Sequence, residues 1–275
     1  MLRTCLLAIA AIAGSGGSLF AQCRDCMPAT IFSWSGEPAV LGSLSTIATD
    51  RPDFTEASST VGLGVAQLEM GYTYTRSAKI DAHSWGELLL RYGVFANWLE
   101  LRAAVSPVSV VSDGTYSGAE DLYLGTKLWL MQQDEWLPEV AVVYQMTVPT
   151  GSPAFTSGHV LPGVNVLYGW DISDDFSLAG STQYNRAVDE ESELYDEWSQ
   201  SATVGVSLLD NVGAYMEWFA FIPGGTPAAL PEHYINGGLT YQLNDDLQFD
   251  VRIGKGLSDA SEDFFAGAGI AFRFR

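Results

Sequence analysis

Apolar and polar residues alternate along most of the chain after about residue 64. In residues 64–76, Leu68, Met70 and Tyr72 fall on one face, whereas Glu69 and Thr73 fall on the other. Successive side chains of a β-strand point to opposite faces, so this stretch predicts a strand with one apolar and one polar face.

The same alternation recurs along the chain and predicts about twelve strands. They cover residues 64–76, 87–94, 99–106, 121–130, 139–148, 163–170, 176–185, 201–208, 212–219, 235–243, 247–254 and 266–274. A soluble β-sandwich also alternates, with its apolar face turned inward, so alternation alone does not distinguish a soluble fold from a membrane barrel.

The connections between these stretches favour the membrane barrel. Short turns at 96–97, 132–135, 173–175, 210–211 and 244–246 alternate with longer stretches at 77–83, 107–119, 150–160, 187–197, 222–232 and 256–263. Outer-membrane barrels pair short periplasmic turns with long outer loops, whereas a sandwich with Greek-key crossings has no reason to keep that order.

Aromatic residues support the same interpretation, because their rings suit the two bilayer interfaces. Tyr and Trp lie near the ends of many apolar faces, at Tyr74, Trp85, Tyr92, Trp98, Trp136, Trp170, Trp198 and Trp218. The last stretch carries Phe272 and Phe274, as terminal barrel strands commonly do, although Arg275 follows them. We therefore predict an all-β, antiparallel up-and-down transmembrane β-barrel of about 12 strands, among the lipids of the outer membrane of a Gram-negative-type bacterium.

The N-terminus has the pattern of a secretory signal. Arg3 precedes an apolar run over residues 5–13, glycines and serines interrupt it at 14–18, and Ala21 offers a cleavage site.

Cys23 and Cys26 follow directly, and in an oxidising compartment they predict a local disulfide. A redox dithiol or half of a metal site are the alternatives, but no second Cys pair and no nearby His supports them. The predicted organisation is a signal peptide at 1–21, an N-terminal extension or plug at 22–60, and the barrel at 61–275.

The charge of the chain excludes some classes of partner. It has 33 Asp and Glu against 13 Lys and Arg, for a net charge of -20. Nucleic acids and anionic membrane surfaces are bound by basic patches, so neither is an expected partner.

The polar faces of the strands are expected to line the lumen of the barrel. The candidate lining residues are Glu69, Glu87, Arg91, Glu100, Arg102, Asp121, Lys127, Glu139, Glu217, Asp250 and Arg252. Charges of both signs in a narrow lumen either form a selective polar path for small solutes or pair with one another in a network that stiffens the barrel. Acidic residues outnumber basic ones in this set, so any ion flow should favour cations.

The segment before the first strand is too polar and too rich in Gly and Ser for a helix. Asp50, Arg51, Asp53 and Glu56 cluster near its end. They are candidates for a plug or gate that docks on lumen partners. A periplasmic extension is the alternative and is slightly favoured.

Two other kinds of chemistry find little support. Acidic residues crowd the stretch 189–197, but without the Asp-x-Asp-x-Asp-Gly spacing of a calcium loop, so a solvated loop is expected and no metal or cofactor is predicted. A lipid-hydrolysing barrel would need a Ser nucleophile and a His base on neighbouring strands. The three histidines, His83, His159 and His233, fall in predicted loops or at the beginning of a strand, and no Gly-x-Ser-x-Gly occurs, so an enzyme is not expected.

Several short motifs are similar in type and order to a known family. They are Thr49–Glu56 followed by Gln67–Tyr72, then Glu120–Lys127, Leu137–Glu139 leading to Val148–Gly151, and Gly238–Tyr241 with Asp250, Arg252 and Gly254. Over residues 49–275 the chain resembles the "MetA-pathway of phenol degradation" family of outer-membrane transporters.

The resemblance implies an outer-membrane channel or transporter for passive passage of small solutes. The family's name adds aromatic or hydrophobic solutes as candidates. A structural or adhesive barrel without a conducting pore is the alternative, and the solute and the oligomeric state stay open.

Overall fold

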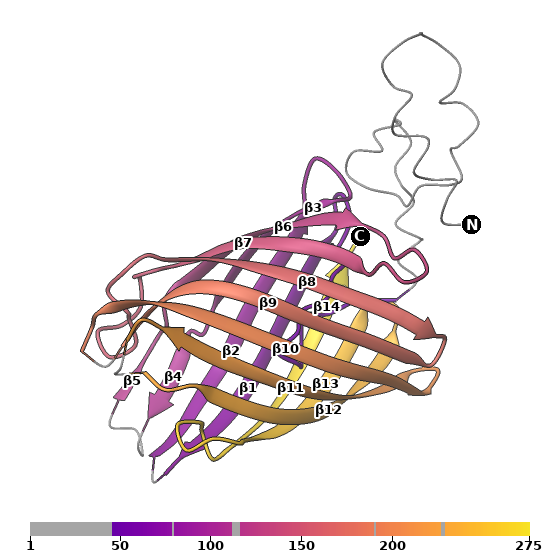
Figure 1. Cartoon of the computed structure of the whole chain (residues 1–275). Coiled ribbons are helices and arrows are strands. Elements are labelled where there is room, and N and C mark those ends of the chain that lie inside the picture. Colours follow the sequence, from indigo (N-terminus) through magenta and orange to yellow (C-terminus); the bar gives the residue numbers. More distant parts are fainter. Residues whose placement is uncertain (1–45, 79, 112–115, 190, 227–228) are drawn as a thin grey trace, which may run out of the picture.

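The computed structural model describes residues 46–275 except 79, 112–115, 190 and 227–228. Within these residues every regular element is a β-strand (Figure 1). The strands are β1 (Ala66–Ser77), β2 (Ile80–Gly93), β3 (Leu99–Val105), β4 (Val108–Val111), β5 (Tyr116–Gly118), β6 (Leu122–Met131), β7 (Glu139–Val148), β8 (Leu161–Ser173), β9 (Phe176–Val188), β10 (Leu194–Leu209), β11 (Val212–Gly224), β12 (Glu232–Asn244), β13 (Leu247–Gly256) and β14 (Phe264–Phe274).

The strands form one closed antiparallel barrel. Each long strand pairs with its neighbours in the chain, and β1 pairs with both β2 and β14, which closes the sheet. Twelve strands make the wall, namely β1–β3 and β6–β14, whereas β4 and β5 extend it at one end. Closure leaves no unpaired sheet edge, as a membrane-spanning β-structure requires. The predicted fold class and strand number are confirmed.

A kink divides the outer half of β2 from the rest of the strand. Residues 82–85 of β2 pair with β4, whereas residues 88–93, on the other side of Gly86, pair with β3. Gly86 has φ +92°, and a Cβ there would lie 2.7 Å from Cγ of Pro107, so the close approach of the β3–β4 connection requires glycine. Glu87 also has a positive φ of 32°.

The prediction of a long loop at 77–83 is wrong. β1 continues to Ser77 and β2 begins at Ile80, so a tight hairpin joins them. Asp81 of this hairpin accepts hydrogen bonds from Tyr74 Oη at 2.7 Å and Arg76 Nε at 2.9 Å. Polar side chains can face outward here because the strands continue beyond the apolar band of the wall, and for that reason the alternation pattern missed them.

The distribution of apolar and charged side chains between the two faces of the wall is the inverse of that in a soluble protein. Leu90, Phe249 and Val251 are 40–50% exposed on the outside. Arg91 and Lys127, on the inside, are fully buried. An apolar exterior around a charged interior suits a barrel whose solvent is lipid.

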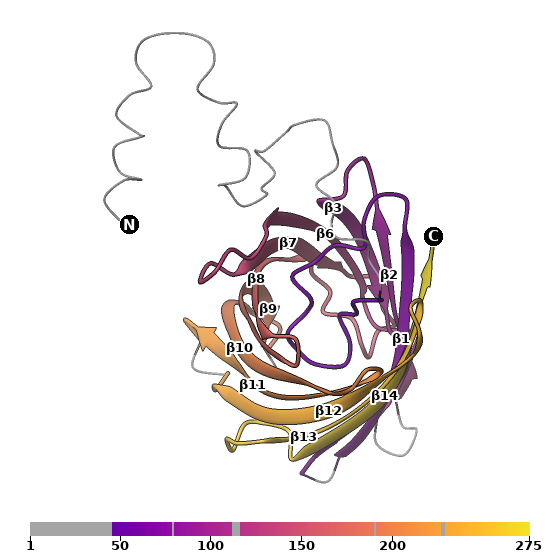
Figure 2. The same cartoon turned by 90° about the vertical axis from the view of Figure 1, so that its right-hand side faces the viewer.

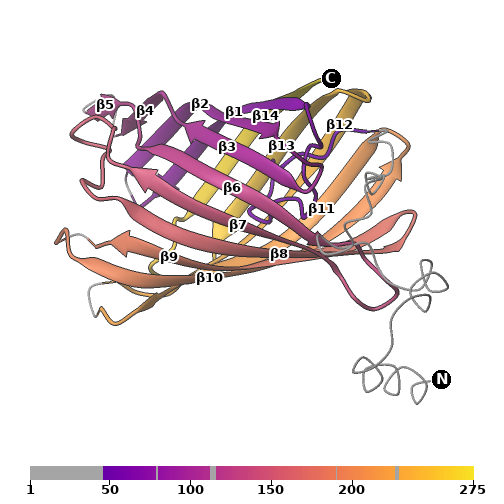
Figure 3. The same ribbon diagram turned by 90° about the horizontal axis from the view of Figure 1, so that it is seen from above.

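The two ends of the barrel differ. The turns after β2, β6, β8, β10 and β12 lie at one end, and the connections that follow β3, β7, β9, β11 and β13 lie at the other (Figure 3). By the usual asymmetry of such barrels, the first end is periplasmic and the second faces outward. The described residues contain no helix long and apolar enough to span a bilayer.

Candidate functional site

Residues 46–65, which we call the inner segment, run inside the barrel (Figure 2). Ile47 N donates to Asp245 O at the β12–β13 turn, at 2.8 Å. The segment leaves at the same end, where Leu63 N donates to Asn97 Oδ1 at 2.9 Å and Leu63 pairs with Gly93. The chain therefore enters and leaves the lumen through the periplasmic end before β1 begins.

Asp50 is the centre of a buried ion cluster. Its carboxylate lies 2.7 Å from Arg102 Nη2, 3.0 Å from Lys127 Nζ and 3.3 Å from Arg91 Nη1. Burial alone would raise the pKa of Asp50, but the charges of Arg91, Lys127 and Arg102 lower it well below its ordinary value. The carboxylate is thus ionised and ties the inner segment to β2, β3 and β6.

Three further carboxylates complete this cluster. Glu69 accepts hydrogen bonds from the backbone N–H groups of Asp50 and Arg51, both at 3.0 Å. Glu100 lies 2.8 Å from Arg91 Nε, and Glu56 lies 2.6 Å from Arg102 Nη1. Because each buried charge has an opposite partner, the desolvation penalty of this cluster is offset.

Arg51 joins the inner segment to the other side of the wall. Its guanidinium lies 2.8 Å from Glu87 and 3.3 Å from Asp250. It rests on Gly71 and Gly269, and a Cβ at either position would collide with it. These two glycines make room for the side chain that links β2 and β13.

Glu217 holds the next part of the inner segment without an ion pair. It accepts hydrogen bonds from Phe54 N at 2.8 Å, from Thr55 N at 2.7 Å and from Asn236 Nδ2 at 2.7 Å. Farther along, Ser58 Oγ donates to Glu139 Oε1 at 2.6 Å.

The structure places ten of the eleven predicted lining residues against the inner segment. Glu100 also accepts a hydrogen bond from Val61 N at 2.9 Å, and Arg252 Nη1 donates to Pro52 O at 3.0 Å. Asp121 is the exception, since it precedes β6 and accepts hydrogen bonds from Gly151 N and Ser157 N, both at 2.9 Å. It lies at the outer end, where it holds the β7–β8 connection, because β6 begins one residue later than the alternation predicts.

The four gate candidates lie inside the barrel and not along an extension outside it. Asp50, Arg51 and Glu56 form ion pairs with the wall. Asp53 forms none among the described residues, and burial together with the charge of Glu217 raises its pKa well above the ordinary value.

Sequence reasoning missed an aromatic cluster on the inner face. Phe54 of the inner segment stacks on Phe219 with ring centroids 4.7 Å apart, and Phe219 stacks on Tyr234 at 4.8 Å. Phe221 and Phe265 complete the cluster. The sequence feature that could have predicted this cluster is the position of Phe219 and Phe221 on the polar face of β11.

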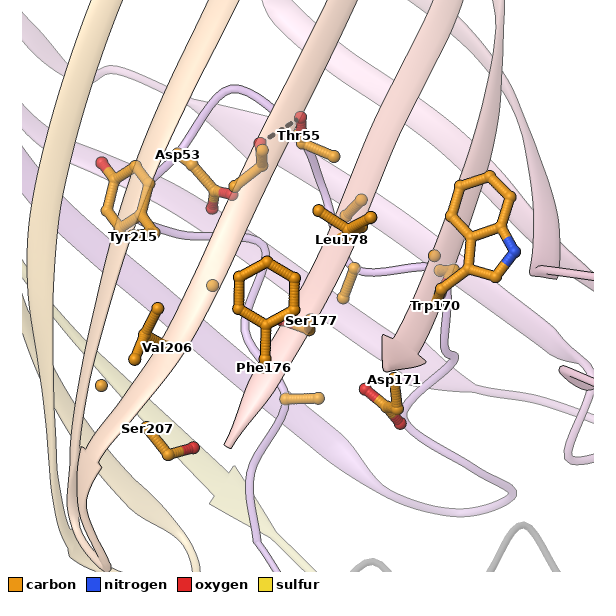
Figure 4. Close-up of a pocket in the computed structure, with 18 of the residues that line it drawn as sticks. Asp53, Thr55, Trp170, Asp171, Phe176, Ser177, Leu178, Val206, Ser207 and Tyr215 are labelled. Carbon is orange, nitrogen blue, oxygen red and sulfur yellow. Dashed lines mark hydrogen bonds between the residues drawn. The ribbon is translucent and has the colours of Figure 1, made fainter. Parts of the chain in front are cut away.

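Two cavities lie beside the inner segment. One of about 590 Å³ opens toward the periplasmic end, between the inner segment and β8–β11, and includes Asp53, Ser177 and Tyr215 (Figure 4). Another of about 350 Å³ lies toward the outer end and includes Glu56, Arg102 and Glu120. The ionisable side chains of the first cavity are Arg51, Asp53, Glu56, Glu139, Asp171, Asp174, Asp175 and Tyr215.

Other sequence predictions concern the ends and loops. The signal peptide and the Cys23–Cys26 pair lie outside the described residues. In the acidic stretch after β9, Asp189 Oδ1 accepts hydrogen bonds from the backbone N–H groups of Glu191 and Glu193, both at 3.0 Å. The described residues contain no group of three side chains placed to hold a metal ion.

Comparison with known proteins agrees with this architecture. The model of the family described as "Putative MetA-pathway of phenol degradation" matches residues 49–274. The chain belongs to this family. The match begins within the inner segment, so the family's pattern includes residues 49–65 as well as the barrel. No curated protein matches the sequence.

Solved structures of similar fold are outer-membrane proteins. The COG4313 outer membrane channel from Pseudomonas putida F1 aligns with a TM-score of 0.61 at 14% identity, over 82% of this chain and 99% of that one. The NanC porin aligns with a TM-score of 0.53 at 11% identity, over 75% and 98% of the two chains. The KdgM porin, solved with disordered oligogalacturonate, gives 0.50 at 13% identity, over 76% and 99%. The fold is that of outer-membrane channels, and the predicted outer-membrane location is confirmed.

Proposed function

We propose that this protein is a narrow, passive channel for small solutes across the outer membrane. The observation that carries the proposal is the pair of cavities that enter the lumen on either side of the inner segment. The inner segment narrows the bore between them, so the conductance should be small and intermittent. Glu217, whose carboxylate accepts hydrogen bonds from Phe54 N and Thr55 N, sets how tightly residues 54–55 close the path.

The periplasmic cavity supports a preference for cations. Six of its lining residues are Asp or Glu, and of these Glu56 is paired with Arg102 and Asp53 has a raised pKa. Glu139, Asp171, Asp174 and Asp175 remain, whereas Arg51, the single Arg or Lys of the cavity, is already paired with Glu87 and Asp250. A narrow path lined by one sign of charge concentrates the opposite ion.

Planar-bilayer recording of the full chain tests this function. We expect small cation-selective steps, and Glu217→Gln should lengthen the open periods because residues 54–55 lose charged acceptors. Thr240→Ser, in the same cavity, is a control that should leave the steps unchanged. A steady, large, anion-selective pore would refute the proposal.

The same recording separates the channel from a structural barrel. The ion cluster around Asp50 favours that second candidate, since it fills and stiffens the lumen. A complete absence of current from the intact chain and from Glu217→Gln would support the structural role.

Aromatic molecules are our candidate solutes within this proposal. The cluster of Phe54, Phe219, Phe221, Tyr234 and Phe265 offers ring faces and edges inside the lumen. Uptake of benzyl alcohol and of an aliphatic alcohol of similar size into proteoliposomes would be compared, and Phe221→Leu should remove any preference for the aromatic one. Equal rates through the unmodified protein would contradict this choice of solute.

We further propose that the protein has no catalytic activity. His83 Nδ1 lies 2.8 Å from Tyr72 Oη on the outer face of the wall, and in the described residues no histidine ring is hydrogen-bonded to a serine. Hydrolysis of a chromogenic ester above the rate without protein would contradict this.

A further inference from the structure

The inner face of β8, β9 and β10 differs from the rest of the lumen. Its middle carries Asn165, Ser181, Gln183, Ser199, Ser201 and Thr203, which we call the hydroxyl wall. No charged side chain points inward between Asp171 at the periplasmic end and Glu197 at the outer end of these strands. The ion pairs of the inner segment instead go to β2, β3, β6 and β13.

The hydroxyl wall holds polar atoms without partners. Asn165, Gln183 and Ser199 lie side by side in register on β8, β9 and β10. Asn165 is 1% exposed, and neither its Oδ1 nor its Nδ2 has a hydrogen-bond partner among the described residues; the same holds for the buried Ser199 Oγ. Buried polar groups are almost always satisfied, so an unpaired amide and an unpaired hydroxyl on the two sides of Gln183 point to a ligand that supplies the missing bonds.

The periplasmic cavity leads to this wall along the same strands. Ala179 and Thr203 line the cavity, and Ser201 is the next inward-facing residue of β10 from Thr203 toward the outer end. Thr55 stands at the junction, with its Oγ1 2.6 Å from Ser201 Oγ and 2.9 Å from Thr203 Oγ1. The contact that closes the path toward Asn165 is therefore made of the hydroxyl groups of Thr55, Ser201 and Thr203, with Glu217 Oε1 accepting hydrogen bonds from Thr55 Oγ1 at 2.6 Å and Thr203 Oγ1 at 2.9 Å.

A hydroxylated solute can replace these contacts one for one. Residues 53–55 form no ion pair in the described part of the chain, whereas residues 50, 51 and 56 do. Displacing Thr55 from Ser201 exchanges hydroxyl for hydroxyl and leaves the charged anchors in place. An organic ion too large to pass with its water would lose its hydration on this wall without gaining a counter-charge, whereas a small cation can pass with its water.

We propose that the hydroxyl wall is the permeation route and that it binds uncharged solutes bearing hydroxyl or amide groups, with Asn165 and Ser199 as their hydrogen-bond partners. This inference rests on the proposed channel function and names the side of the lumen and the class of solute. Phe221, which pairs with Ser199 in register, places a ring face beside the site for the carbon skeleton.

The route is tested with two matched cysteine variants. Ala179→Cys lies on the proposed route, and Ala271→Cys, also inward-facing, lies on β14 on the far side of the inner segment. A methanethiosulfonate reagent should cut the current through Ala179→Cys by about half or more and leave Ala271→Cys unchanged, because a narrow path is sensitive to added bulk. Blockade of Ala271→Cys alone would overturn the route.

The binding site is tested with xylitol as the neutral probe. Asn165→Leu with Ser199→Ala should slow xylitol entry into proteoliposomes about fivefold or more, since the solute loses its hydrogen bonds. The double variant should keep the heat-dependent gel mobility of the unmodified chain, which shows that the barrel is folded. The control is Ser84→Ala, which removes another buried and unpartnered hydroxyl on β2.

The outcomes separate this inference from the proposed function. If the unmodified chain passes neither potassium nor xylitol, the channel itself fails. If it passes both and the double variant behaves like Ser84→Ala, the channel stands and the hydroxyl wall is refuted as the binding site.

Discussion

At the scale of single residues, Asp50 holds the inner segment in the barrel. Its carboxylate faces three buried cations, Arg91, Arg102 and Lys127. We expect Asp50→Asn to lower the free energy of unfolding by about 3–5 kcal/mol, because it leaves buried charges uncompensated. Urea unfolding of the refolded barrel in detergent measures this change.

A matched control for Asp50 is available at the periplasmic end. Asp246 lies 2.8 Å from Arg273, but its own side chain is 43% exposed in a turn. Solvent reaches this carboxylate, and the buried Arg273 keeps hydrogen bonds to Thr46 O and Asp245 O, so Asp246→Asn should cost less than about 1 kcal/mol. Equal losses from the two variants would mean that Asp50 is not an anchor.

Gly269, which makes room for the Arg51 side chain, gives a further prediction at the scale of single residues. A methyl group at Gly269 would collide with the Arg51 guanidinium, which is the far end of a flexible side chain and can move away. Gly269→Ala should therefore weaken the Arg51–Asp250 contact and raise the open probability in bilayer recordings, with little loss of stability. At Gly169 the nearest atom to a new Cβ is Ser58 Oγ at 3.3 Å, so Gly169→Ala serves as the control. Indistinguishable recordings from both variants would show that Arg51 has no part in gating.

At the scale of elements, the strands and the inner segment obey different rules. The strands were predictable because the wall has lipid on one side and a polar interior on the other, so side chains alternate locally. The inner segment has no such period, because its environment is the interior surface built by strands far away in sequence. The outer half of β2 was not predicted from the sequence for a related reason. The strand kinks at Gly86 and continues past the apolar band, so Asp81 and His83 face outward and break the alternation.

The orientation of the strands can be tested on β13. Val251 is half exposed on the outer face, midway along its strand. Val251→Arg should destabilise the barrel in lipid vesicles by about 2–4 kcal/mol, because the charge must enter the hydrocarbon layer. Asn211→Arg, in the exposed β10–β11 turn, should have almost no effect in the same denaturant titration. Unchanged stability of the Val251→Arg variant would mean that β13 does not face lipid.

At the scale of the whole molecule, closure is the dominant property. All twelve wall strands are paired on both sides, so local opening exposes backbone groups that have no alternative partner in a bilayer. We expect unheated protein in dodecyl sulfate to migrate on a gel as a compact species and boiled protein to migrate differently. Identical mobilities would argue against a closed, detergent-resistant barrel.

The sequence by itself determined the all-β class, the number of wall strands, their polar inner faces and the family. These follow from the alternation of neighbouring residues and from short motifs, which can be recognised in a single sequence. Only the tertiary structure decided that the inner segment lies within the lumen, that Asp50 meets three cations from three strands, and that β8–β10 form an uncharged wall. Those facts depend on barrel closure and register, which bring residues as distant as Arg51 and Asp250 into contact through pairings that no local pattern encodes.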